Sequence, residues 1–268
     1  MQKSYERLKK QEGIPTVPKE RRIRPIHIWQ SAAAILFLLL ASSVYLSTVG
    51  TKAETDLLQQ YIPIAEMRSL TLPDGTKVQL NSKSTLLYPQ EFTGDSRSVF
   101  LLGEANFKVK PDKKRPFIVK SNDLQITALG TEFNVSAYPE SQEIATTLIS
   151  GSIRVAYNNL TTSVILHPNE QFAYNRNNKK YDLSNPDMDD VTAWQRGELV
   201  LQKMTLTDII NVLERKYPYA FVYSIKNLKN DRFSFRFKDN APLEEVMEII
   251  VNVVGQMDYR IVEDKCYL

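Results

Sequence analysis

The stretch Leu124-Gln-Ile-Thr-Ala-Leu-Gly-Thr-Glu-Phe-Asn-Val-Ser-Ala-Tyr138 decides the fold class of the largest part of this chain. Apolar and polar residues alternate from Leu124, a glycine interrupts them, and the alternation resumes from Phe133. Alternation with period two indicates a strand with one buried face, and a glycine between two such runs indicates a turn. The stretch therefore predicts two consecutive β-strands.

The same pattern recurs on both sides of this stretch, between residues 67 and 181. Short alternating runs are separated by turn signals such as Pro73-Asp74-Gly75, and no helical pattern lies between them. This spacing predicts an all-β domain over residues 67–181, and it leaves open whether the domain is a sandwich or a solenoid. The further strands are expected at Arg68–Leu72, Thr76–Leu80, Val99–Leu102, Ala105–Val109, Phe117–Lys120, Ile144–Ile149, Ile153–Tyr157 and Val164–Leu166.

The pattern changes again after an acidic, proline-containing stretch at residues 182–193, which we interpret as a linker. From Trp194 onward, strand and helix patterns alternate, which predicts a small α+β domain at residues 194–268 built as a duplicated β-α-β unit. Thr205 is a plausible N-cap of the first helix, and Gly255 fits the C-terminal end of the second. The expected elements are strand 199–201, helix 206–216, strand 220–223, strand 233–237, helix 242–254 and strand 259–262.

A run of 22 residues without charge, residues 28–49, predicts a transmembrane helix. At 1.5 Å per residue such a helix spans about 33 Å, against roughly 30 Å for a hydrocarbon core. Eight lysines and arginines stand against three glutamates in the preceding tail, residues 1–27, so the positive-inside rule places that tail in the cytoplasm and the C-terminal bulk outside it. The side chains expected to hold the helix in the membrane are Trp29, Leu36, Phe37, Leu38, Leu39, Leu40 and Tyr45.

A cleavable signal peptide is the competing interpretation, since Ala41-Ser42-Ser43 resembles a cleavage site. The long leading tail and the uncharged run up to Val49 favour an anchor. Residues 50–66 then read as a juxtamembrane segment, a short helix or linker that ends near Pro63.

No constellation of catalytic or cofactor-binding residues stands out. The single cysteine, Cys266, has no disulfide partner, and His27 and His167 lie too far apart in the chain to predict a metal site. Glu104 and Glu132 are best interpreted as solvated acids at strand ends. A net charge of +3 gives no argument for nucleic-acid binding. The sequence therefore predicts a protein that is not an enzyme and that needs neither a cofactor nor a metal.

Six short stretches of the β-rich part follow one another in a characteristic order: Leu72–Asn81, Leu102–Val109, Phe117–Val119, Ala128–Val135, Gly151–Val155 and Pro168–Gln171. Together they resemble FecR-like sigma-factor regulators (anti-sigma factors) of the type common in Bacteroidetes. The resemblance covers residues 67–268 and the anchor, and the part from Trp194 is similar to the short N-terminal signalling domain of secretins and TonB-dependent receptors.

The resemblance implies a single-pass protein of the bacterial inner membrane whose bulk is periplasmic. Its partners would be the N-terminal signalling domain of a TonB-dependent outer-membrane receptor, an extracytoplasmic-function sigma factor and the lipid bilayer, with no nucleic acid. A small mixed domain can bind another by strand addition at an exposed edge, so we expect docking at Arg232–Lys238 or Tyr259–Val262. The residues expected at these edges are Arg232, Phe233, Phe235, Phe237, Tyr259 and Ile261. For the three phenylalanines, packing in the core is the commoner interpretation, and a platform on which a ligand stacks is the rarer one.

One feature departs from the family. Members carry a helical cytoplasmic domain that binds the sigma factor, whereas here only the proline-interrupted residues 1–27 precede the uncharged run. The sequence therefore suggests that this domain is truncated or missing, and a periplasmic binding or scaffold module without transcriptional output is the alternative function.

Overall fold

The computed structural model describes residues 25–50, 57–224, 231–239, 241–255 and 257–268. It contains two compact units, Met1–Glu54 and Thr55–Leu268, which we describe separately. Most of the predicted basic tail and residues 51–56 lie outside the described residues.

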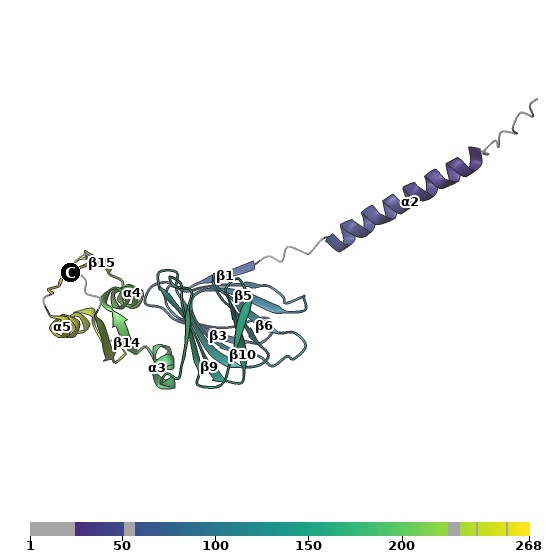
Figure 1. Cartoon of the computed structure of the whole chain (residues 1–268). Helices are drawn as coiled ribbons and strands as arrows, with labels where there is room; N and C mark the ends of the chain where they lie inside the picture. Colours follow the sequence, from purple (N-terminus) through teal and green to yellow (C-terminus); the bar gives the residue numbers. More distant parts are fainter. Residues whose placement is uncertain (1–24, 51–56, 225–230, 240, 256) are drawn as a thin grey trace, which may run out of the picture. The chain divides into compact units, whose positions relative to one another are not determined.

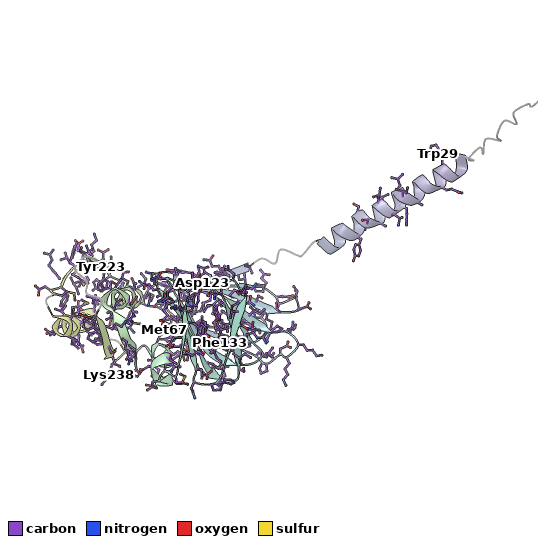
Figure 2. The ribbon with its side chains drawn as sticks, in the orientation of Figure 1. Trp29, Met67, Asp123, Phe133, Tyr223 and Lys238 are labelled. Carbon is purple, nitrogen blue, oxygen red and sulfur yellow. The ribbon has the colours of Figure 1, made fainter. Side chains whose placement is uncertain are left out.

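The first unit contains the helix α2 (Pro25–Gly50), which covers the whole of the uncharged run (Figure 1). Its described apolar side chains are exposed and point away from the helix axis, as the sticks from Trp29 onward show (Figure 2). Within the part of the chain that the structure describes, no helix is both long enough and apolar enough to cross a membrane.

The second unit begins with a β-rich region whose strands form one curled sheet of 13 strands. Nine of them follow the order β11-β10-β7-β6-β5-β8-β9-β12-β13, with β3 and β4 also paired to β5, β2 to β3, and β1 to β4. All pairs are antiparallel except β5·β6. The strands are β1 (Leu57–Tyr61), β2 (Arg68–Thr71), β3 (Lys77–Leu80), β4 (Thr85–Pro89), β5 (Arg97–Lys108), β6 (Phe117–Lys120), β7 (Gln125–Ala128), β8 (Glu132–Ala137), β9 (Glu143–Ser150), β10 (Ile153–Tyr157), β11 (Thr162–Leu166), β12 (Gln171–Asn175) and β13 (Tyr181–Ser184).

The curl depends on β5, which belongs to both halves of the sheet. Its first part pairs with β4 and β6, and its second part pairs with β3 and β8. Gly103 lies where these sets of partners meet, with φ at +103°, and an added Cβ would lie 2.4 Å from the hydroxyl of Ser84. Only glycine fits there, since a side chain would meet both a strained backbone and a steric clash.

The two halves of the sheet enclose one hydrophobic core. Tyr157 of β10 lies 5.4 Å from Phe172 of β12, ring centre to ring centre, although several strands separate them in the sheet. Phe107 and Phe133 stack at 5.4 Å in the same core. The alternation along strands such as β5, β7 and β10 is therefore explained, because every second side chain points into this core.

Two segments differ from the expectation. Residues 57–61, expected in a juxtamembrane helix or linker, form β1, which is fixed by its pairing with β4 and not by an alternating pattern of its own. The expected linker at residues 182–193 contains most of β13 and two short helical segments, α3 (Met188–Thr192) and the 3₁₀ helix η1 (Ala193–Arg196).

The C-terminal region is the predicted α+β domain with a separate core. Thr205 caps α4 by accepting the amide of Asp208, and Gly255 caps α5. The order strand–helix–strand occurs twice, but the halves do not form separate sheets: β14 pairs with β16, and β15, β18 and β17 form a second sheet. The elements are β14 (Leu199–Thr205), α4 (Leu206–Lys216), β15 (Ala220–Val222), β16 (Arg232–Phe237), α5 (Leu243–Val254), β17 (Arg260–Val262) and β18 (Lys265–Tyr267).

Candidate partner-docking site

The aromatic side of β16 faces the core of the C-terminal region. Phe235 and Phe237 are only 8% and 6% exposed, and their rings stack at 5.9 Å. Phe233 stacks on Phe235 at 6.3 Å and is partly buried. These side chains are therefore packing residues of the docking strand rather than a platform for a ligand.

The opposite side of β16 is exposed and polar. The hydroxyl of Ser234 accepts the amide of Lys203 at 2.9 Å, and Arg232 donates to the Lys203 carbonyl at 2.7 Å. Both bonds hold the bulge of β14, where Lys203 has φ at +50°. The same side chains that the sequence assigned to docking thus also shape the neighbouring strand.

Arg236 anchors this face to the preceding helical segment. It donates to Asp189 at 2.8 Å and to Glu198 at 3.1 Å, and it also pairs with Asp190. Arg196 binds Asp189 and Glu198 as well, and the hydrogen bonds from Arg196 and Arg236 lower the pKa of Glu198. This exposed network fixes one end of β16, and sequence reasoning did not identify it.

The two strands expected to dock a partner are both edge strands among the described residues. β16 pairs only with β14, and β17 pairs only with β18. Beside β17, Tyr259 donates its hydroxyl to the carbonyl of Glu244 at 3.1 Å, and Ile261 packs partly into the core. Each edge therefore leaves one row of backbone groups available to an added strand.

The described part of the C-terminal region has two further edge strands, β14 and β15, and β15 differs from the others. The carboxylate of Glu214 on α4 accepts the backbone amide of Phe221 in β15 at 3.2 Å. This bond occupies a donor that an added strand would need, so β15 is partly closed by a side chain of its own domain. Nothing in the local pattern around Glu214 signals this role, since the contact depends on how α4 packs.

A cleft of about 240 Å³ lies within the second unit, lined by the β-rich and C-terminal regions together. Glu104 on β5 accepts amide hydrogens from Asn81 at 2.8 Å and Asn134 at 3.0 Å. Asn134 in turn accepts the indole N–H of Trp194 at 3.2 Å. Burial raises the pKa of Glu104, whereas the two amides and the nearby Arg215 act in the opposite direction.

The expectation that Glu104 is a solvated acid is therefore wrong, although Glu132 does sit at a strand end, 3.3 Å from exposed Lys108. The groups that act on Glu104 come from distant positions in the chain: Asn81, Asn134 and Arg215. In this cleft the carboxylate of Glu104 is hydrogen-bonded to two amides. The described residues contain no group of three or more His, Cys, Asp or Glu side chains that could hold a metal.

The anchor residues predicted from the sequence all lie in the first unit. Trp29, Leu36 to Leu40 and Tyr45 are exposed on α2. The structure thus groups the predicted site residues into three places: the apolar surface of α2, the β16 edge and the β17 edge.

Comparison with known proteins assigns both regions of the second unit. A family model described as FecR protein matches residues 62–154, and a model described as FecR, C-terminal, matches residues 198–268. No curated protein sequence matches the chain.

Two crystal structures of a candidate anti-sigma factor from Parabacteroides distasonis ATCC 8503 are similar to this chain. The first, at 2.50 Å resolution, is 34% identical with a TM-score of 0.74, over 79% of this chain and 98% of the other. The second, at 1.65 Å, is also 34% identical with a TM-score of 0.73, over 78% of this chain and 97% of the other. Because both family models match in order and nearly the whole of a relative is covered, the chain belongs to the FecR family of sigma-factor regulators.

Proposed function

We propose that this protein is a membrane-anchored regulator that relays a periplasmic signal from a TonB-dependent outer-membrane transducer to an extracytoplasmic-function sigma factor. In this proposal the segment 28–49 anchors the chain in the inner membrane with its N-terminus in the cytoplasm. The C-terminal region meets the signalling domain of the transducer in the periplasm.

The helix α2 and its charge pattern support the anchor. The helix is 26 residues long, and its exposed apolar side chains would be costly in water over so large a continuous surface. The basic residues at positions 19–24 precede it, which is the arrangement expected on the cytoplasmic side of a membrane.

The observation that carries the docking proposal is the contrast between the edges of the C-terminal region. Among the described residues β14, β15, β16 and β17 each have one neighbouring strand, but Glu214 caps a donor on β15. Strand addition takes its affinity from backbone hydrogen bonds, so an edge with free amides can accept a partner strand and a capped edge accepts one less readily. The partner domain is therefore expected to extend β16 or β17, the two strands that the sequence assigned to docking and that carry no such cap.

Docking by strand addition is tested by measuring the affinity of the transducer's signalling domain for the full-length chain in lipid nanodiscs. The strands β17 and β18 form a hairpin with a two-residue loop, and the pair Val262–Lys265 closes it. In such a hairpin the next pair, Ile261–Cys266, does not exchange backbone hydrogen bonds. The backbone N–H of Ile261 is therefore expected to face the open edge. Ile261→Pro removes that donor, and Ser234→Pro tests β16. Ile261→Val and Ser234→Thr are the matched controls, because they keep the backbone N–H.

We expect one of the two proline variants to weaken binding by at least about tenfold, the effect of losing roughly one well-formed hydrogen bond and its neighbours. The corresponding control should bind like the unmodified chain, and circular dichroism should show that the proline variant is folded. Wild-type affinity in both folded proline variants would rule out docking by strand addition at β16 and β17.

A further inference from the structure

The C-terminal end of α4 is bound to the β-rich region at two separate loops. The carbonyl of Arg215 accepts the backbone amide of Ala65 at 3.0 Å, in the loop between β1 and β2. The guanidinium of Arg215 donates to Glu140 at 2.7 Å and lies 3.8 Å from the ring centre of Tyr138, in the loop between β8 and β9. One residue thus connects α4 to both loops.

The loop between β8 and β9, which contacts the Arg215 guanidinium, has its backbone fixed by hydrogen bonds. Arg176 donates from one nitrogen to the carbonyls of Tyr138 and Ser141, both at 2.7 Å, and to that of Pro139 at 3.1 Å. Tyr138 is almost fully buried and donates its hydroxyl to the carbonyl of Ser82 at 3.0 Å. Glu140 is therefore presented by a fixed backbone, which makes the Arg215 side chain, itself 10% exposed, a well-defined contact.

The loop between β1 and β2, whose Ala65 amide donates to the Arg215 carbonyl, has a strained backbone. Ala65 has φ at +62°, a left-handed conformation that is unfavourable for a residue with a side chain. Residues 62–67 connect β1, which begins seven residues beyond α2, to β2. A strained backbone persists only where its surroundings hold it, and the bond from Ala65 to Arg215 is such a restraint.

The rest of this junction combines polar and apolar side chains. Asn134, Thr147 and Gln171 are cross-strand neighbours on β8, β9 and β12, and they line the cleft together with Met67, Trp194 and Val212. Trp194 bonds to Asn134. The cores of the β-rich and C-terminal regions share no residue. Movement of one region against the other is the default expectation at such an interface, because each core is buried independently.

α4 also belongs to the same core as the docking strands. Ile209, Ile210 and Leu213 of α4 pack with Phe235 of β16 and with Ile261 of β17 in one cluster. A partner that shifts either strand therefore acts on a core that includes α4, and Arg215 is the residue of α4 that reaches out of that core to the β1–β2 loop.

We infer that Arg215 is a positioning residue of the relay. It joins the partner-docking region to the loop 62–67. Whether its contacts with Ala65 and Glu140 break or persist when a partner docks transmits the signal toward the segment that leads to α2. This rests on the proposed function and adds the route of the signal within the second unit. The route bypasses most of the sheet, because Ala65 and Arg215 are in direct contact.

The test uses the full-length chain with Arg215→Met, which keeps the length of the side chain but removes the charge, and Glu140→Gln as a milder variant that acts from the opposite side. Lys108→Met, which breaks an exposed ion pair with Glu132 in the β-rich region, is the control. Three quantities are measured: hydrogen exchange of the peptide containing residues 62–67, binding of the transducer's signalling domain, and induction of a sigma-dependent reporter in cells.

We expect Arg215→Met to speed exchange of this peptide by about tenfold or more, because loss of the bond to Glu140 frees the end of α4 whose carbonyl accepts the Ala65 amide. Glu140→Gln should act in the same direction with a smaller effect, while peptides of β10 and β11 stay unchanged. Signalling-domain binding should stay within about twofold of wild type, and reporter induction should fall to the uninduced level. Lys108→Met should leave all three unchanged.

Normal induction by Arg215→Met, or unchanged exchange at residues 62–67, would overturn the inference. So would a global rise in exchange together with loss of signalling-domain binding in both Arg215→Met and Glu140→Gln, since Arg215 would then only stabilise the fold. Failure of the proposed function looks different: the unmodified chain would neither bind the signalling domain nor change the reporter.

Discussion

The guanidinium of Arg97 donates to the carboxylate of Asp74 at 2.7 Å inside the β-rich region, where the two side chains are only 1% and 4% exposed. Arg97 also donates to the carbonyls of Lys110 and Arg115, both at 2.9 Å, and Asp74 accepts the amide and the hydroxyl of Thr76. The turn before β3, the start of β5 and the segment before β6 are thus held together by one ion pair.

Breaking this pair should destabilise the second unit strongly. Arg97→Met leaves the Asp74 carboxylate buried without its cation, which typically costs about 3–5 kcal/mol of unfolding free energy. Lys108→Met is the matched control, since the Lys108–Glu132 pair is 68% and 29% exposed and such pairs contribute less than about 1 kcal/mol. Urea unfolding followed by circular dichroism measures both. Equal losses in the two variants would show that the Arg97 pair has no special role.

The raised pKa of Glu104 should make stability depend on pH. A carboxyl whose pKa is higher in the folded than in the unfolded state favours folding while it is protonated, below its ordinary value of 4.5. This contribution is lost as the pH rises from there through the folded-state pKa. Glu104→Gln cannot titrate, so the difference in unfolding free energy between the wild type and this variant should change with pH above 4.5. A constant difference would mean that Glu104 titrates normally.

Cys266 should be unreactive in the folded protein. Its side chain is 0% exposed, and burial, with a smaller contribution from Glu244, raises the pKa of the thiol to about 11. Because the thiolate is the reactive species, alkylation by iodoacetamide at pH 8 should be slow in the native protein and fast after unfolding in urea. Mass spectrometry of the intact chain follows the reaction. Rapid labelling of the native protein would contradict the packing of β18.

The anchor proposal predicts membrane retention that depends on the centre of α2. The wild-type chain should stay in the membrane fraction after alkaline carbonate washing. A charged residue at the centre of an inserted helix costs about 2.5–3.5 kcal/mol, so Leu38→Asp together with Leu39→Asp should reduce retention sharply. Trp29→Asp, near the end of the helix, is the control and should have a small effect. Recovery of the unmodified chain in the wash would refute the anchor.

Local pattern was enough to predict most strands and both long helices. The alternation in Phe133–Tyr138 corresponds to β8, and the helical spacing of Leu206, Ile209, Ile210 and Leu213 corresponds to the buried face of α4. In both cases one face is buried in a single core, so the sequence period follows directly from the geometry of the element.

Features created by distant contacts could not be predicted. β1 is mostly exposed and has no alternation, and only its pairing with β4 makes it a strand. The environment of Glu104 depends on Asn81, Asn134 and Arg215, and the environment of Arg215 depends on Glu140, 75 residues away. The strands β16 and β17, where docking is expected, were identified from their pattern, but the capping of β15 by Glu214 follows only from tertiary packing.

The most direct test of the central claim is the output of the cognate sigma factor in cells that carry or lack this protein. A reporter driven by a promoter of that extracytoplasmic-function sigma factor is measured with and without the transducer's inducing substrate, and the full-length chain is purified to ask whether the sigma factor accompanies it. The account predicts a change in reporter output of about tenfold on deleting the gene, loss of the response to the substrate, and co-purification of the sigma factor. An unchanged reporter in both conditions, with no sigma factor bound, would contradict it.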